Sequence, residues 1–228
     1  MIYEANVRPR RATDSLTCPV DTSRPQLSKS FAARRLQSIR VGTSDLTMFR
    51  RRIVGTLVEQ ASSAENRGMP DPKTRILFIC MGNICRSPAA EAVFLRLLED
   101  RGIAASYHVD SAGTGGWHAG EPADHRSRSE GARRGHDLST RARQVHDGDW
   151  DAFELLVCMD RDNASILLER GAPEAKIRLL LDWHPDPEHV EVPDPYYGGE
   201  DGFVHMYDLI EEACERLVDE LQAAGPTA

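Results

Sequence analysis

The pattern of apolar positions divides the chain near residue 72. Beyond that point, short apolar runs alternate with segments whose apolar residues recur every three to four positions, which indicates strands alternating with helices. The apolar runs predict strands over 76–79, 105–110, 153–159 and 177–181. The helical spacing predicts helices over 89–100, 123–134, 161–170 and 202–223. This alternation is typical of an α/β domain in which helices cover both faces of a four-stranded parallel sheet, a three-layer α/β/α arrangement.

The first 72 residues lack this periodicity and differ in charge. Residues 1–70 hold 12 Lys or Arg and 6 Asp or Glu, a net charge of +6, whereas the whole chain carries −8, which leaves −14 for residues 71–228. A segment this polar buries too little apolar surface to offset the entropy lost on ordering. We therefore predict a largely disordered basic extension over 1–72 and one domain over 73–226. The composition of the extension also fits an organellar transit peptide. Alternatively, the true start of the protein is Met69, and the residues before it result from an error in assigning the start site.

A cysteine and an arginine with five residues between them stand between the first predicted strand and helix, at Cys80 and Arg86. A loop of this length can turn several backbone N–H groups toward one centre, where the following helix adds the positive end of its dipole. A cysteine thiolate is a nucleophile, and a guanidinium can hold two phosphate oxygens at once. The spacing therefore predicts a phosphate cradle above a reactive thiol, formed by Met81, Gly82, Asn83, Ile84, Cys85, Arg86 and Ser87.

Several residues of this loop suit the expected shape. Gly82 permits a left-handed turn or a close approach of the backbone to a ligand. Asn83 belongs to the few residue types other than glycine that tolerate left-handed geometry. Ser87 is placed to cap the helix, and its hydroxyl could also donate to the Cys80 thiolate. Pro88 suits the first helical position, where an N–H group is not needed.

A second candidate loop covers residues 193–199, which read Pro-Asp-Pro-Tyr-Tyr-Gly-Gly. The prolines stiffen the loop and the glycines let it bend, so that it can present Asp194 to a neighbouring site. Phosphate ester cleavage needs a general acid that protonates the departing oxygen, and Asp194 is a candidate for this role. Tyr196 and Tyr197 could form an aromatic wall beside a flat substrate. Taken alone, the loop would be an ordinary acidic turn, and the cysteine loop is what favours the functional interpretation.

These motifs together resemble the low-molecular-weight protein tyrosine phosphatase family, from about Arg75 to about Gln222. That family carries a C-x5-R-S loop early in its domain and an Asp-Pro-aromatic-Tyr loop near its end, as Cys80–Ser87 and Asp194–Tyr197 do here. Three further segments resemble the family in the same order, over 110–118, 135–144 and 157–160. The resemblance implies the phosphotyrosine phosphatase I-like fold and a metal-independent hydrolysis of phosphotyrosine through a cysteinyl-phosphate.

The resemblance also implies a role for each matching residue. Cys80 would be the nucleophile, Arg86 would bind the phosphate and Asp194 would be the general acid. The residues that would support the loop and the thiolate are Asn83, Ser87 and Ser111. The residues that would line the substrate cleft are Ile84, Trp117, Tyr196 and Tyr197. We expect no cofactor and no metal site, since the eight histidines show no ligand spacing beside a carboxylate.

Three alternative functions are less well supported. Arsenate reductases that couple to thioredoxin share the cradle but need a relay pair of cysteines, and Cys158 has no partner at the usual spacing. Protein-arginine phosphatases usually carry threonine at the position of Ile84. A non-catalytic phosphate-binding module would not need a nucleophile and an acid together. The motifs do not separate the chain from the bacterial tyrosine phosphatases linked to sugar polymers.

The five cysteines are odd in number and scattered, which favours a reducing compartment such as the cytoplasm, or an organelle if residues 1–70 are a transit peptide. Cys85 shares the loop with Cys80, so the pair predicts a reversible disulfide that would protect an oxidised Cys80. We expect a phosphotyrosine protein as substrate, a tyrosine kinase as partner and a monomeric state. The charge of −14 over residues 71–228 disfavours nucleic acid, and no apolar run predicts a membrane segment.

Overall fold

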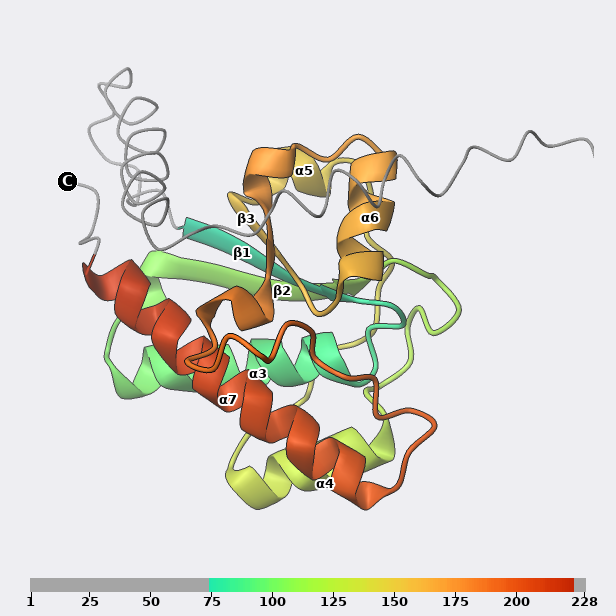
Figure 1. Ribbon diagram of the computed structural model, residues 1–228, viewed down its shortest axis with the longest axis vertical. Helices are drawn as coiled ribbons and strands as arrows, with labels where there is room; N and C mark the ends of the chain where they lie inside the picture. Colours follow the sequence, from blue (N-terminus) through green and yellow to red (C-terminus); the bar gives the residue numbers. More distant parts are fainter. Residues whose placement is uncertain (1–73, 224–228) are drawn as a thin grey trace, which may run out of the picture. The chain divides into compact units, whose positions relative to one another are not determined.

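The computed structural model describes residues 74–223, so the predicted extension over 1–72 lies outside the described residues. Four parallel strands form one sheet in the order β2-β1-β3-β4, which confirms the predicted α/β class. The strands are β1 (Thr74–Cys80), β2 (Tyr107–Gly113), β3 (Leu155–Cys158) and β4 (Ile177–Leu179). Strand β1 therefore has a neighbour on each side, and its carboxyl end lies at the middle of one sheet edge (Figure 1).

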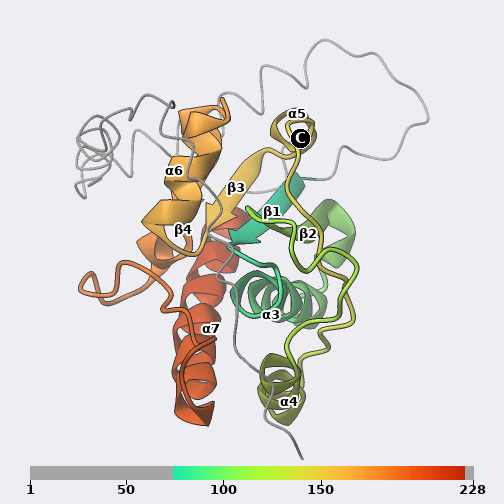
Figure 2. The same cartoon turned by 90° about the vertical axis from the view of Figure 1, so that its right-hand side faces the viewer.

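Helices cover both faces of this sheet, as Figures 1 and 2 show. One face carries α3 (Arg86–Asp100) and α7 (Glu200–Ala223), and α4 (His125–Arg134) packs against both of them. The other face carries α5 (Asp149–Ala152) and α6 (Arg161–Glu169). Three short 3-10 turns complete the described elements, η1 (Ala104–Ser106), η2 (Glu174–Lys176) and η3 (Leu180–Trp183). Within residues 74–223, none of the helices combines the length and apolar character that crossing a bilayer requires.

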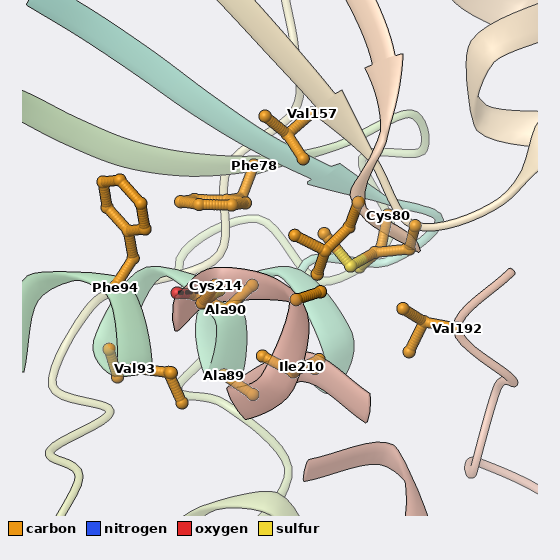
Figure 3. Packing of buried hydrophobic residues seen from close by; sticks show 14 of the residues in the cluster. Phe78, Cys80, Ala89, Ala90, Val93, Phe94, Val157, Val192, Ile210 and Cys214 are labelled. Atoms are coloured by element: carbon orange, nitrogen blue, oxygen red, sulfur yellow. Dashed lines mark hydrogen bonds between the residues drawn. The ribbon is translucent and has the colours of Figure 1, made fainter. Parts of the chain in front are cut away.

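The central strand β1 is buried on both faces, which explains its continuous apolar run. Ile76 and Phe78 face α3 and α7, whereas Leu77 and Ile79 face the layer that holds α6. Successive side chains of a strand point to opposite faces, so a strand covered on both faces must be apolar throughout. In Figure 3 the Phe78 ring meets the Phe94 ring of α3, with centroids 5.4 Å apart. Cys80 ends the same strand.

The second strand runs further than its apolar residues indicate. The sequence predicts a strand over 105–110, but the strand covers Tyr107–Gly113. Its last three residues, Ser111–Gly113, are small and pair with Phe78–Cys80 of β1. Small or polar residues carry no apolar signal, although close packing against the first strand buries them here. This extension places Ser111 beside the loop that follows Cys80.

Helix α3 begins at Arg86, three residues before its predicted start. Cys85 occupies the cap position without a side-chain capping bond, so the prediction that Ser87 caps the helix is wrong. Ser87 and Pro88 are instead the second and third helical residues, and Pro88 still lies in the first turn, where its missing N–H costs no helical bond. The Ser87 hydroxyl is used elsewhere, because it lies 3.1 Å from the Cys80 sulfur.

Candidate active site

The loop between β1 and α3 curls around the Cys80 sulfur. Asn83 has a backbone φ of 55°, and it is the only residue other than glycine with a positive φ in the described part of the chain. This turn directs the Asn83 N–H at Cys80 Sγ, 3.2 Å away. Gly82 does not take the left-handed conformation. A Cβ at Gly82 would lie 3.2 Å from Cδ2 of His118, a tight contact that a small shift of the His118 ring would relieve.

The Cys80 side chain is only 2% exposed, and two polar groups face its sulfur. One is the Asn83 N–H and the other is the Ser87 hydroxyl, 3.1 Å from Sγ. The same hydroxyl also lies 3.3 Å from the Ala112 carbonyl oxygen, so its single hydrogen can serve either acceptor. The nearer of the two contacts is the one to sulfur. The sulfur thus lies at the beginning of α3, where donors and the helix dipole favour negative charge.

A chain of side-chain hydrogen bonds holds the loop in this shape. The Asn83 amide donates to Ser87 Oγ at 2.9 Å and to Ser111 Oγ at 2.8 Å. Its carbonyl oxygen accepts the Arg143 N–H at 2.8 Å. Ser111 Oγ in turn donates to Glu91 Oε2 at 2.6 Å. The structure thus brings together Asn83, Ser87 and Ser111, the three residues expected to support the loop.

Arg86 is 3% exposed and connects three parts of the chain. Its Nη1 donates to Asp160 Oδ2 at 2.6 Å and to the Val192 carbonyl at 3.3 Å. Its Nη2 donates to Asp194 Oδ2 at 2.9 Å. Asp160 is itself fixed, because its other oxygen caps α6 by accepting the Asn163 N–H at 2.7 Å. Asp160 and Asp194 therefore fix the orientation of the Arg86 guanidinium without a bound phosphate.

The structure places Asp194 beside Arg86 of the cradle, although the two residues are 108 positions apart, and its role as general acid stays a prediction. Its second oxygen accepts the Tyr196 N–H at 3.1 Å, which sets the direction of the carboxyl within its loop. Beyond it, the Tyr196 and Tyr197 rings meet edge to face, with centroids 5.1 Å apart, and Tyr197 is 96% exposed. These rings stand at the surface of the same loop, residues 193–199, which we call the acid loop.

The other predicted cleft residues differ in exposure. Trp117 is 72% exposed, and its ring lies so close to Gly115 that a Cβ there would be 1.7 Å from the ring. Ile84, in contrast, is buried and belongs to the main core cluster. Its expected place in the substrate cleft stays a prediction.

Cys85 lies buried in the same loop as Cys80. Burial, and next the charge of Asp124, raise the pKa of the Cys85 thiol. Cys85 is therefore a neutral thiol at physiological pH, and its disulfide with Cys80 stays a prediction.

Comparison with known proteins identifies the family. A family model described as low molecular weight phosphotyrosine protein phosphatase matches residues 75–226. The chain belongs to this family. A low molecular weight protein-tyrosine-phosphatase of Streptomyces coelicolor is 42% identical over 149 residues, 63% of this chain and 91% of the relative.

Solved structures agree with this assignment to the low molecular weight phosphatases. A protein tyrosine phosphatase from Entamoeba histolytica is 42% identical, with a TM-score of 0.64, over 66% of this chain and 98% of its own. An arginine phosphatase from Drosophila is 31% identical, with a TM-score of 0.61, over 64% of this chain and 97% of its own. The fold is thus shared with phosphatases of more than one named specificity.

In this member of the low molecular weight phosphatase family, sequence reasoning missed three residues around the cradle. Asp160 lies two residues after β3, within the family-like segment over 157–160, so the rule that sites form at the carboxyl ends of parallel strands could have assigned it a role. Glu91 is a buried carboxyl on the apolar face of α3, a rare position that signals a hydrogen-bonded role. Arg143 contributes a backbone N–H, which has no signal in the sequence.

Proposed function

We propose that the chain is a protein tyrosine phosphatase that hydrolyses phosphotyrosine in proteins through a cysteinyl-phosphate intermediate. The observation that carries this proposal is the convergence of a thiol, a guanidinium and a carboxyl on one centre. Cys80 Sγ is faced by two polar groups, and Arg86 lies 2.9 Å from the carboxyl of Asp194. A nucleophile, an anion-binding group and an acid are the groups that phosphate ester cleavage needs.

In the proposed first step, Cys80 Sγ attacks phosphorus while the bond between phosphorus and the tyrosyl oxygen breaks. Asp194 gives its proton to that oxygen, so the product leaves as a phenol. Arg86 holds two of the phosphoryl oxygens and stabilises their charge, so the charge needs no other cation. The thiolate before attack is supported by the Asn83 N–H at 3.2 Å and by the Ser87 hydroxyl at 3.1 Å.

In the second step a water molecule attacks phosphorus and gives a proton to Asp194. The bond between sulfur and phosphorus breaks, and its electron pair returns to Cys80 as thiolate. The loop keeps its shape through both steps, because the Asn83 amide is tied to Ser87 and Ser111. Such preorganised donors need no rearrangement as the charge moves.

We propose phosphotyrosine rather than phosphoarginine as the substrate. The exposed aromatic residues beside the cradle, Trp117 and Tyr197, fit a phenyl ring. The second candidate is arginine phosphatase activity, favoured by the similar fold of the Drosophila arginine phosphatase. We further propose a monomer that acts in the cytoplasm on the products of a tyrosine kinase. The free thiols of Cys80, Cys85, Cys158 and Cys214 fit a reducing compartment.

The test is phosphate release from a phosphotyrosine peptide, measured beside phosphoarginine, and beside arsenate with thioredoxin, all with EDTA present. We expect turnover of phosphotyrosine that EDTA does not change. Cys80→Ser should lower this turnover by at least about 1,000-fold, because a hydroxyl is a far weaker nucleophile. Cys214→Ser is the matched control, since that buried thiol of α7 lies 4.0 Å from the Ala90 carbonyl oxygen of α3 and has no role in the proposed mechanism.

Each other outcome points to a different conclusion. Turnover of phosphoarginine without phosphotyrosine would favour the second candidate. Reduction of arsenate would place the relay chemistry in this chain. Phosphate release by Cys80→Ser at the wild-type rate would contradict the mechanism.

A further inference from the structure

The first turn of α4 contacts both loops of the site. The Asp124 N–H donates to the Ile84 carbonyl at 2.7 Å, and the Ser127 hydroxyl donates to the Cys85 carbonyl at 3.1 Å. Two successive carbonyls of the cradle over 81–87, which we also call the phosphate loop, are thus held by groups at the beginning of this helix. On its other side, Nη1 of Arg126 donates to the Tyr196 carbonyl at 3.1 Å. The turn therefore bridges the phosphate loop and the acid loop.

Arg126 is held in one orientation by Asp124. Asp124 Oδ1 accepts the Arg126 Nε at 3.0 Å, and Oδ2 accepts Nη2 at 2.9 Å, a two-point contact that fixes the guanidinium plane. Its hydrogen bond with Arg126 lowers the pKa of Asp124, so the carboxyl is ionised at neutral pH. The guanidinium also lies 4.7 Å from the ring centroid of Phe203 and 5.6 Å from that of Tyr196. Only Nη1 is left for the acid loop.

Helix α4, whose first turn holds Asp124 and Arg126, is anchored to α7 and to its own cap residue. Ser127 is fully buried, and its carbonyl accepts the Tyr207 hydroxyl of α7 at 3.0 Å. The Arg128 N–H closes the first helical bond on the Asp124 carbonyl at 2.9 Å. The first turn of α4 is therefore fixed in place. Movement of the acid loop relative to the phosphate loop requires breaking the contacts of Arg126.

The acid loop has two side-chain attachments near its active carboxyl. One is Arg86 with Asp194, and the other is Arg126 with Tyr196 and, more weakly, Gly198 at 3.5 Å. A bound phosphoryl group takes donors of Arg86 for its own oxygens, so the first attachment weakens when the substrate enters. The second attachment then sets where the carboxyl stands.

We propose that Arg126 is a positioning residue for Asp194. It holds the acid loop over the phosphate loop so that the carboxyl meets the leaving oxygen. This inference rests on the proposed phosphatase function. Its consequence is specific: without Arg126 the cradle still binds phosphate, but proton donation to the leaving group fails. Substrates that need a proton from the enzyme should suffer more than those that do not.

The test compares Arg126→Ala with Arg133→Ala in the full chain. Arg133 is the matched control, since it stands on the same helix, pairs with Glu130 and is largely exposed. The substrates are phenyl phosphate, whose leaving group is poor, and p-nitrophenyl phosphate, whose leaving group is good. We expect Arg126→Ala to lower kcat/KM, which reports the step in which the leaving group departs, by about 10- to 100-fold for phenyl phosphate and by less than about threefold for p-nitrophenyl phosphate. Asp194→Ala should show the same selectivity more strongly.

Two further measurements separate positioning from damage to the fold. The inhibition constant of inorganic phosphate should stay unchanged in Arg126→Ala, because the cradle keeps its donors. Arg126→Lys keeps the charge but cannot reach Asp124 and the Tyr196 carbonyl together, so its leaving-group selectivity should be intermediate. It also serves if the alanine variant does not fold.

Equal slowing of both aryl phosphates, or weaker binding of inorganic phosphate, would overturn the positioning role while leaving the proposed function intact. If the wild type hydrolyses neither aryl phosphate, the proposed function itself fails.

Discussion

Glu91 shows at the scale of one residue how burial changes chemistry. It stands on the inner face of α3, is 4% exposed and accepts the Ser111 hydroxyl at 2.6 Å. Burial raises its pKa to about 7. Between the ordinary pKa of a glutamate and this value, the folded state keeps a proton that the unfolded chain has lost. The free energy of unfolding therefore falls as the pH rises through this window.

Glu91→Gln removes the ionisation and should flatten this pH dependence. The advantage in unfolding free energy of the variant over the wild type should grow by about 2 kcal/mol from about pH 5 to about pH 8. Urea unfolding at the two pH values measures it. Glu99→Gln, an exposed change on the same helix, is the control and should follow the wild type. A constant difference between Glu91→Gln and the wild type would show that the carboxyl is ionised throughout.

The sequence predicted residues whose chemistry depends on local spacing, and missed those whose role depends on distant contacts. Cys80 and Arg86 are six positions apart, so their loop could be interpreted directly. Asp194 was found because its loop has an unusual composition. Arg126 has ordinary neighbours, and its role arises from a contact with a residue 70 positions away. No local pattern carries that information.

At the scale of elements, the crossing of α4 and α7 depends on one glycine. Helix α4 has almost no apolar stripe, and its buried residues are Ser127 and Gly131. A Cβ at Gly131 would lie 2.5 Å from the Tyr207 hydroxyl oxygen and 2.7 Å from Cδ1 of Leu138. Tyr207 cannot move aside easily, because it is fully buried and its hydroxyl is bonded to Ser127. The helices can approach this closely only because glycine has no side chain.

Gly131→Ala should destabilise the protein, although alanine normally favours a helix by about 1 kcal/mol over glycine. We expect a loss of about 1–3 kcal/mol from overpacking at the crossing. Gly202→Ala in α7 is the matched control, since its Cβ would meet Pro195 only at an ordinary 3.5 Å, and it should be neutral or stabilising. Chemical unfolding measures both. Stabilisation by both substitutions would mean that the crossing has room for a methyl group.

The predicted elements match the structure in kind and order, and they differ at their ends. Apolar runs located β1 and β3 most clearly, because these two strands are buried on both faces. The run over 177–181 was predicted as one strand, but strand β4 ends at Leu179 and Leu180 begins the turn η3. Both leucines after this point are buried, and burial in a turn gives the same apolar signal as burial in a strand.

At the scale of the whole molecule, the described site draws on segments that meet at one edge of the sheet. Cys80 ends β1, Asp160 lies two residues after β3, and Ser111 lies in the last part of β2. Parallel strands bring their carboxyl ends together, so these parts of the site are assembled within residues 74–223. The family model matches residues 75–226 and does not include the basic extension over 1–72.

A chain that begins at residue 73 should therefore fold and act like the full chain. We expect kcat/KM for an aryl phosphate to agree within about twofold, and the melting temperature to differ by less than about 2 °C, the smallest shift that 1 kcal/mol produces in a domain of this size. The full chain measured in the same buffers is the control. A lower melting temperature or turnover at every ionic strength would mean that residues 1–72 pack against the domain. A difference that disappears in high salt would instead indicate attraction between the extension over 1–72, at +5, and the rest of the chain, at −13.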